Sequence, residues 1–300
     1  MAKAAKKSKI GKMKVGFVGC GAMGEPMAGH VLKSGKFDVH IFDINPASTK
    51  KIAKKGAKIE KSLANLGKAC DVFIVMVGYD HQVKQVVTDL AKVGKKGAVI
   101  VITATSHPDN IWECAAIARK RGMDVIDAPV AFGLDGARDG TLASCVGGEK
   151  KSVEKARPVL ECYSRAVHHL GDLGSGELGK TMNNMLHWAH AIANYEAILL
   201  GKVYGLDAQK VRAMLCQMPG TNGTLVRWEE TRFTWQGKDM DIGMDLAQKR
   251  DLPLPFFGVV DQMIKWFHAD DVKALLNKKK APYMGKMYDS KPISTDYGKK

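Results

Sequence analysis

A glycine-rich turn between an apolar run and a helical segment limits the folds open to this chain more than any other feature. Residues 14–19 are largely apolar, Gly19, Gly21 and Gly24 follow as G-x-G-x-x-G, and residues 22–34 have helical spacing. In such a turn the first glycine permits the tight bend, the second lets a pyrophosphate approach the backbone, and the third lets helix pack on strand. The predicted cofactor-binding residues of the turn are Gly19, Gly21, Ala22, Met23 and Gly24.

Short apolar runs alternate with helical segments through the first half of the chain, which is the βαβ pattern of a parallel sheet. Strands are expected at residues 14–19, 39–43, 72–77, 99–103, 125–127 and 143–146. Helices are expected at residues 22–34, 46–55, 81–92 and 109–121. Because the glycine turn follows the first of these strands, the pattern predicts a Rossmann-type dinucleotide-binding domain.

The pattern changes in the second half of the chain. In residues 176–204 apolar side chains recur every three and four positions and Gly205 follows, which predicts one long helix. The predicted fold class is α/β: an N-terminal Rossmann-type parallel-sheet domain followed by an all-helical C-terminal domain, joined by a long interdomain helix. The expected divisions are a basic flexible tail at 1–12, a dinucleotide-binding domain at 13–173, a helical substrate and dimerisation domain at 174–276, and a basic tail at 277–300.

Asp43 lies 19 residues after Gly24, at the end of the second expected strand. An acidic residue at about this spacing binds the ribose 2′-hydroxyl of NAD, and its charge repels the 2′-phosphate of NADP. No arginine follows it closely to hold such a phosphate. NAD is therefore the expected cofactor, and NADP is disfavoured. The structural alternative is an aspartate that only closes the turn before Asn45 and Pro46.

The net charge of +15 raises the question of nucleic-acid binding, so its distribution along the chain matters. Residues 1–14 carry six lysines and no acid, and residues 273–300 carry eight lysines against two aspartates. The two ends thus hold 12 of the 15 charges, and the middle of the chain is nearly balanced. Two solvated basic tails are expected, with no specific nucleic-acid partner.

Membrane and metal functions find no support in the sequence. No apolar run approaches the ~20 residues that span a bilayer, and no apolar stretch follows the N-terminal lysines as in a secretory signal. The six cysteines have no Cys-x-x-Cys and no Cys/His metal spacing. His187 and His190 lie three apart but lack a third ligand spaced nearby. A cytoplasmic protein with reduced thiols, no membrane span and no metal is expected.

Four separated segments share a pattern with one known family. They are residues 15–28, which contain the glycine turn; residues 127–130 followed by 140–142; residues 174–184; and residues 238–240. In this order, over roughly residues 14–265, they resemble the β-hydroxyacid dehydrogenases, such as 3-hydroxyisobutyrate dehydrogenase and the enzymes of tartronate semialdehyde. Four motifs in the same order are much more specific than the glycine turn alone.

The resemblance implies hydride transfer between NAD and a small 3-hydroxy acid of the 3-hydroxyisobutyrate or tartronate semialdehyde type. It assigns Lys180 as general acid/base, and Asn184, one helical turn later, as a substrate-positioning residue. Burial in an interdomain cleft would lower the pKa of a lysine ammonium toward the range useful for proton transfer. The further cofactor contacts that the resemblance implies are Val77, Gly78, Thr105 and Lys238.

The substrate segment departs from the family pattern. Where the family continues from Pro-Val into Ser-Gly-Gly, this chain has Ala131, Phe132 and Gly133. In the family, the serine and the glycine N–H groups hold the substrate carboxylate. Ala131 removes a hydroxyl donor and Phe132 adds a ring, so the pocket is expected to be smaller or suited to a flatter, less polar substrate. The alternative is that Phe132 turns away into packing.

Two other functions fit the same architecture. An imine reductase shares the plan of a Rossmann domain followed by helices, but generally lacks the lysine and asparagine found here as Lys180 and Asn184. A non-catalytic, dehydrogenase-like binding module would keep the fold and lose the lysine; the basic ends give it some support. Lys180 and Asn184 favour the dehydrogenase. The apolar long helix further predicts a homodimer or homotetramer.

Overall fold

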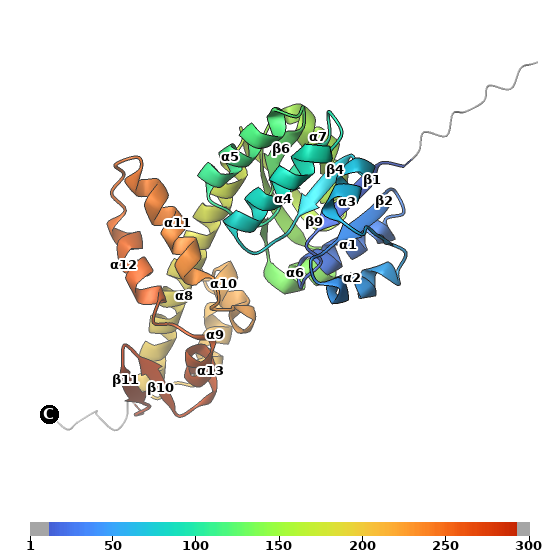
Figure 1. Cartoon of the computed structure of the whole chain (residues 1–300). Helices are drawn as coiled ribbons and strands as arrows, with labels where there is room; N and C mark the ends of the chain where they lie inside the picture. The colour runs from blue at the N-terminus through green and yellow to red at the C-terminus, as the bar shows by residue number, and fades with distance from the viewer. Residues whose placement is uncertain (1–11, 293–300) are drawn as a thin grey trace, which may run out of the picture. The chain divides into compact units, whose positions relative to one another are not determined.

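The computed structural model describes residues 12–292 of the chain. It divides into two compact units, and the boundary falls between Lys180 and Thr181. This boundary lies inside helix α8 (Ser175–Val203), which is the longest helix in Figure 1. Residues 175–180 of α8 therefore belong to the first unit, and the remainder of the helix belongs to the second.

The first unit is built on a nine-stranded sheet whose order begins β3-β2-β1-β4-β5-β6. All neighbours in this series are parallel, which gives the strand order of a Rossmann fold, reversing between β1 and β4. The strands are β1 (Lys14–Val18), β2 (Asp38–Phe42), β3 (Lys58–Ile59), β4 (Val72–Val75), β5 (Val99–Ile102), β6 (Asp124–Asp127), β7 (Val130–Ala131), β8 (Leu142–Gly147) and β9 (Ser164–Gly171).

Beyond β6 the sheet is mixed. β8 is antiparallel to β6 and to β7 and parallel to β9. Because β6 and β8 pair only where Asp127 faces Gly147, most of β8 extends past the carboxyl ends of the parallel strands, together with β7. The sheet thus carries an extension at the edge where ligands of such folds bind.

Helices cover both faces of this sheet. Alternate residues of β4 and β5 enter two separate hydrophobic clusters, as the period of two in a strand requires. One cluster includes side chains of α1, α2 and α7, and the other includes side chains of α3, α4 and α5. Each fully buried Val, Ile or Leu contributes about 1.5–3 kcal/mol. The helices are α1 (Gly24–Lys33), α2 (Pro46–Ala53), α3 (Leu63–Ala69), α4 (Asp80–Val93), α5 (Pro108–Arg119), α6 (Gly133–Asp139) and α7 (Lys150–Leu160).

The second unit packs its elements on one face of α8. Trp188, Ile192, Tyr195 and Leu199 recur at spacings of three and four and are all buried in its core. The other elements are α9 (Ala208–Leu215), α10 (Gly223–Val226), a 3₁₀ helix (Trp228–Glu230), α11 (Gln236–Gln248), α12 (Pro255–Ile264), α13 (Ala269–Asn277) and the antiparallel strands β10 (Lys280–Tyr283) and β11 (Lys286–Asp289).

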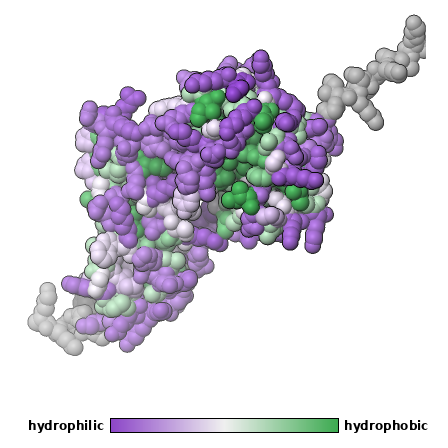
Figure 2. All heavy atoms as spheres, viewed as in Figure 1, coloured by the Kyte–Doolittle hydropathy of each residue, from purple (hydrophilic) through white to green (hydrophobic). Residues whose placement is uncertain are grey.

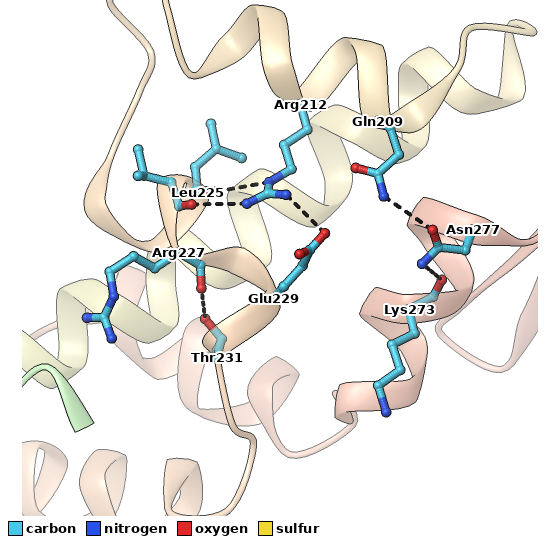
Figure 3. Close-up of polar contacts among 9 residues, drawn as sticks. Gln209, Arg212, Leu225, Arg227, Glu229, Thr231, Lys273 and Asn277 are labelled. Atoms are coloured by element: carbon cyan, nitrogen blue, oxygen red, sulfur yellow. Dashed lines mark hydrogen bonds and ion pairs between the residues drawn. The ribbon is translucent and has the colours of Figure 1, made fainter. Parts of the chain in front are cut away.

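Arg212 of α9 holds the short helix α10 in place (Figure 3). Its guanidinium donates to the carbonyl oxygens of Leu225 at 3.2 Å and Val226 at 3.0 Å, near the end of α10, and pairs with Glu229 at 3.2 Å. A helix end leaves such carbonyls without intrahelical partners, so an arginine there stabilises a helix too short to persist alone.

The predicted order of elements is confirmed. Each of the six expected strands and five expected helices is present, with ends within two residues of those predicted. The Asn45 side chain caps α2 by accepting from the Ala47 N–H at 3.1 Å, with Pro46 in the first turn. The sheet is parallel only as far as β6, because the chain reverses through β7 and β8.

The prediction of a flexible tail from residue 277 is wrong for residues 280–289. These residues form the β10–β11 hairpin, whose Ala281 is fully buried and whose Tyr283 and Tyr288 pack against the core of the second unit. Hydrophobic side chains at these three positions outweigh the surrounding lysines. The expected tail at residues 1–12 lies outside the described residues, apart from Lys12.

The surface shown in Figure 2 is mostly hydrophilic, with hydrophobic residues gathered in small patches. Within residues 12–292, no helix has the length and apolar character that crossing a membrane requires.

Candidate active site

The glycine turn has the backbone that its sequence predicts. Gly19 has a φ of +90°, and a Cβ there would lie 2.2 Å from the Met76 carbonyl oxygen. A Cβ on Gly24 would lie 1.9 Å from the carbonyl oxygen of Gly19, so only glycine lets α1 begin so close to β1. A Cβ on the exposed Gly21, by contrast, would meet nothing within 4 Å. This open backbone, with Ala22 and Met23 leading into α1, fits a pyrophosphate.

Asp43 follows β2 and is tied to the turn. Its Oδ2 accepts from the Cys20 N–H and its Oδ1 accepts from the Asn45 N–H, both at 2.7 Å. The second bond is the one expected of an aspartate that closes the turn before Asn45 and Pro46. A carboxylate oxygen has two acceptor sites, so both oxygens keep capacity for a ribose hydroxyl. The structure therefore adds a positioning role to the predicted one.

The loops after β4 and β5 are joined by a polar cluster. The Ser106 hydroxyl donates to Asp80 Oδ1 at 2.9 Å, and the His107 N–H donates to Asp80 Oδ2 at 3.2 Å. The Asn110 amide donates to Ser106 Oγ at 2.8 Å. The cluster fixes the two loops that carry the predicted cofactor contacts Val77, Gly78 and Thr105.

The backbone N–H of Gly78, a predicted cofactor contact, is occupied within the protein. It already donates to the Gln82 side-chain oxygen at 3.0 Å, at the start of α4. A cofactor contact at Gly78 is therefore left to its carbonyl oxygen, since an N–H forms one strong hydrogen bond at a time.

Asp127 fixes the start of helix α8. It is fully buried at the end of β6, where Oδ1 accepts from the Gly174 N–H at 2.8 Å and Oδ2 accepts from the Glu177 N–H at 2.7 Å. Burial raises the pKa of this carboxyl, and the backbone N–H groups oppose the rise. A Cβ on Gly176 would lie 2.8 Å from the carboxylate, so the close approach depends on glycine. Lys180 follows less than one turn after Glu177.

Lys180 is half-buried in the first turns of α8. Burial raises the pKa of the Cys145 thiol on β8, and the nearby ammonium of Lys180 opposes that rise. A Cβ on the preceding residue, Gly179, would lie 3.6 Å from the Cβ of Cys145, so this part of α8 lies beside β8, the strand that extends past the carboxyl edge of the parallel sheet. Asn184, one turn later on α8, is only 7 % exposed, and its side-chain oxygen accepts from the Asn183 amide at 3.1 Å.

Three further side chains of α8 fix neighbouring elements of the second unit. His187 Nδ1 lies 2.8 Å from the Thr224 hydroxyl on α10, and Asn194 exchanges two hydrogen bonds with the N-cap residue Asn222, at 3.1 and 2.8 Å. The indole N–H of Trp188 donates to Asp239 on α11 at 3.1 Å. Asp239 is buried, and the preceding residue is Lys238, a predicted cofactor contact, whose ammonium lies 5.7 Å from the ring centroid of Trp235.

Phe132 in the substrate segment has a φ of +83°, a left-handed conformation that favours glycine. Its ring packs against the hydrophobic cluster that includes side chains of α1, α2 and α7. The guanidinium of Arg165 lies 4.1 Å from the ring centroid. The backbone shape that a glycine would give is thus kept with a phenylalanine in place. The ring therefore has contacts with the hydrophobic cluster and with Arg165. Ala131 pairs with Ala143 of β8, and Gly133 begins α6.

Comparisons with known proteins match both halves of the chain. Residues 14–171 match the model described as the NAD binding domain of 6-phosphogluconate dehydrogenase. Residues 174–275 match the model described as "NAD-binding of NADP-dependent 3-hydroxyisobutyrate dehydrogenase". The 3-hydroxyisobutyrate dehydrogenase of Pseudomonas aeruginosa is 34% identical over 215 residues, which cover 70% of this chain and 72% of that protein.

Solved structures give the same result. The 3-hydroxyisobutyrate dehydrogenase of Mycobacterium tuberculosis with L-serine has a TM-score of 0.79 and 27% identity, covering 89% of this chain and 98% of that one. An imine reductase variant from Myxococcus stipitatus, in complex with NAD⁺, has a TM-score of 0.64 at 20% identity, covering 95% and 99% of the two chains. The second likeness extends to the fold alone.

The fold and the glycine turn define a dinucleotide-binding oxidoreductase. With a family model matched over residues 14–171 and the agreement of the relatives, this chain belongs to the β-hydroxyacid dehydrogenase family, enzymes that use NAD to oxidise hydroxy acids.

Several residues that build this site were not predicted as site residues. Asp127 lies 47 positions before Gly174, to which it is hydrogen-bonded, and Arg165 lies 33 positions after its contact Phe132, which was predicted. Thr224, which binds His187, carries no motif of its own. A carboxylate at a strand end is a weak signal by itself, because it becomes informative only when its partner N–H groups are known.

Proposed function

We propose that this protein transfers a hydride between NAD and a small 3-hydroxy acid of the 3-hydroxyisobutyrate or tartronate semialdehyde type, with Lys180 as general acid/base. The observation that carries the proposal is the fixed start of α8. Asp127 holds the backbone of Gly174 and Glu177, and Lys180 projects from the next turn of the helix. A general acid/base must be held within reach of the proton it moves, and a helix anchored at its first turn provides that.

In the oxidation direction, the neutral amine of Lys180 accepts the proton of the substrate hydroxyl while a hydride leaves the same carbon. Bound NAD supplies the hydride acceptor. In the reduction direction, the ammonium of Lys180 returns the proton to the carbonyl oxygen. Asn184, one turn along α8 and nearly buried, positions the hydroxyl or the carboxylate through its amide. Ala131, Phe132 and Gly133 line the substrate through their backbone.

The chain's own residues support NAD as the cofactor. Gly19 to Gly24 give the open turn for the pyrophosphate, and Asp43 supplies the carboxylate for the ribose. Val77, Gly78, Thr105 and Lys238 are proposed to complete the contacts. The carboxylate of Asp43 would repel the 2′-phosphate of NADP, because no arginine stands within the next several residues to neutralise it.

The imine reductase is the second candidate, favoured by a shared fold. An imine substrate has no hydroxyl proton for Lys180 to accept. The presence of both Lys180 and Asn184 on one face of α8 favours the hydroxy acid. The non-catalytic binding module lacks support for the same reason.

A homo-oligomer in the cytoplasm completes the proposal. Met182 and Leu186 lie one turn apart on α8 and are 53% and 51% exposed. Large apolar side chains at helical spacing on a surface indicate a protein contact. Sedimentation of the full chain should give a dimer or tetramer, and a monomer at micromolar concentration would contradict this part of the proposal.

The Lys180→Ala variant tests the proposal. We expect kcat to fall about 10²–10⁴-fold, the usual contribution of a positioned acid/base, with little change in NAD affinity. Lys180→Arg should restore little, because a guanidinium does not release its proton near neutral pH. The measurement is single-turnover NADH formation at saturating NAD, with 3-hydroxyisobutyrate, L-serine and, in reverse, tartronate semialdehyde. A rate within threefold of wild type would show that Lys180 is not the acid/base.

A further inference from the structure

Arg165 stands at an irregularity in the sheet. β9 is parallel to β8, but the pairing shifts: Leu142 faces Ser164 and the next residue, Ala143, faces Ala166. Arg165 is therefore the extra residue of a β-bulge. Bulges redirect a side chain and occur often beside active sites. At this bulge, the long cationic side chain of Arg165 lies against Phe132, which follows strand β7.

The segment that receives it is the substrate segment. Ala131 pairs with Ala143, and Ala143 pairs with Ala166, so the three alanines form one row across β7, β8 and β9. Phe132 and Arg165 are next to the two ends of that row, and the guanidinium lies 4.1 Å from the ring centroid of Phe132. The row lies beyond the carboxyl ends of the parallel strands, where β6 stops at Asp127.

The stack fixes the cation and leaves its donors available. The Arg165 guanidinium lies over the Phe132 ring, and a ring face offers no strong hydrogen-bond acceptor, so this contact does not occupy the N–H donors. Within residues 12–292, the Arg165 guanidinium has no carboxylate within salt-bridge distance, and it lies over the ring of Phe132. An oriented guanidinium of this kind matches the two oxygens of a carboxylate.

The sequence at this place lacks one carboxylate donor. Ala131 has no hydroxyl, whereas the family pattern has a serine there. Phe132 keeps a left-handed backbone at φ +83°, which costs about 1–2 kcal/mol for a non-glycine residue. A ring retained at that cost has compensating contacts, and those with the hydrophobic cluster and with the Arg165 guanidinium are among them.

We propose that Arg165, held on the Phe132 ring, binds a carboxylate of the substrate in place of the missing serine hydroxyl. This rests on the proposed function, because it assigns a specificity residue to the same substrate site. Arg165 touches the reacting molecule at its acidic group and takes no part in proton or hydride transfer. Phe132 acts through Arg165 and is a positioning residue.

The test compares an acid with its uncharged counterpart. Wild type, Arg165→Met, Arg165→Lys and Phe132→Leu are assayed with 3-hydroxyisobutyrate and its primary amide, and with L-serine and its primary amide. Arg121→Met is the matched control, because it removes an equal charge from an exposed arginine just after α5, where the next strand, β6, begins. NAD affinity, measured by titration, checks that each variant is folded.

In wild type we expect kcat/KM for the acid to exceed that for the amide by about 10–100-fold, the size of one charge-assisted contact. Arg165→Met should reduce the preference to about threefold or less, through KM rather than kcat. Arg165→Lys should keep part of it, Phe132→Leu should show an intermediate loss, and Arg121→Met should match wild type. An unchanged acid preference in Arg165→Met, with NAD affinity intact, would overturn the proposal.

Calorimetric titration of the same acids and amides into the NADH-loaded enzyme separates this proposal from the proposed function. Acid-selective binding that disappears in Arg165→Met supports the role of Arg165 even where wild type shows no turnover, a result that would contradict the reaction alone. Turnover with unchanged selectivity contradicts the role of Arg165 alone. Failure of wild type to bind any acid would overturn both.

Discussion

The glycine turn at residues 19–24 and the substrate segment at residues 131–133 belong to the same unit, and both need left-handed backbone. In the turn, Gly19 meets that need with a residue that has no Cβ. In the substrate segment, Phe132 adopts the left-handed conformation with a full side chain. The turn recognises its ligand by bare backbone and open space, so its sequence is constrained. The substrate segment can change its side chains when other residues supply the lost contacts.

The largest effect on stability is expected at Gly24, where a neighbouring backbone atom leaves no room for a side chain. Gly24→Ala places a methyl group 1.9 Å from the Gly19 carbonyl oxygen, so we expect unfolding free energy to fall by about 3 kcal/mol. Gly21→Ala meets nothing within 4 Å and should cost less than about 1 kcal/mol. Denaturant unfolding measures both. NAD affinity should fall in both variants, and equal stability of the two would contradict the distinction.

A smaller effect is expected at Asp43, which serves the turn and the ribose together. We expect NAD to be preferred over NADP by at least about tenfold in kcat/KM, or ~1.4 kcal/mol. The pair Asp43→Ala with Ile44→Arg should move the preference toward NADP, because Ile44 is 87% exposed and an arginine there has room. Ile44→Arg alone is the control. Equal kcat/KM for the two cofactors in wild type would refute the role of Asp43.

The smallest effect on stability is expected at Phe132, where two variants test whether the left-handed backbone favours glycine. Glycine is usually less stable than alanine by roughly 0.5–1 kcal/mol in regular structure. At φ +83° the order should reverse, so Phe132→Gly should be more stable than Phe132→Ala by about 1 kcal/mol. Both variants lose the same ring contacts, so the difference isolates the backbone. Thermal unfolding that ranks alanine above glycine would show that the left-handed conformation is not retained.

The cofactor-binding half of the site could be predicted from the sequence because its signals are local. The turn Gly19 to Gly24, the cap Asn45 before Pro46 and the aspartate after β2 are each defined within a few residues. Strand β9 was missed because its residues, which include His168 and His169, are polar and largely exposed.

The contacts that shape the substrate half are distant in sequence. The bulge that directs Arg165 depends on the pairing of β9 with β8, and its ring partner is 33 residues away. The pairing of Asp127 with the start of α8 spans 47 residues. A single sequence holds no record of which strand will face which, so side chains whose role depends on that pairing are not visible in it.

Helix α8 limits how such proteins can be recombined. The boundary between the two units falls after Lys180, inside this helix, while the carboxylate that caps its first turn comes from Asp127 on β6. A chimera joined at the boundary keeps Asp127 with the helix start that it caps, but places the join inside α8. A join before Gly174 keeps the helix whole only if the donor's sixth strand ends in a carboxylate. The start of α8 therefore depends on a residue of β6, and exchange between relatives must transfer the two together.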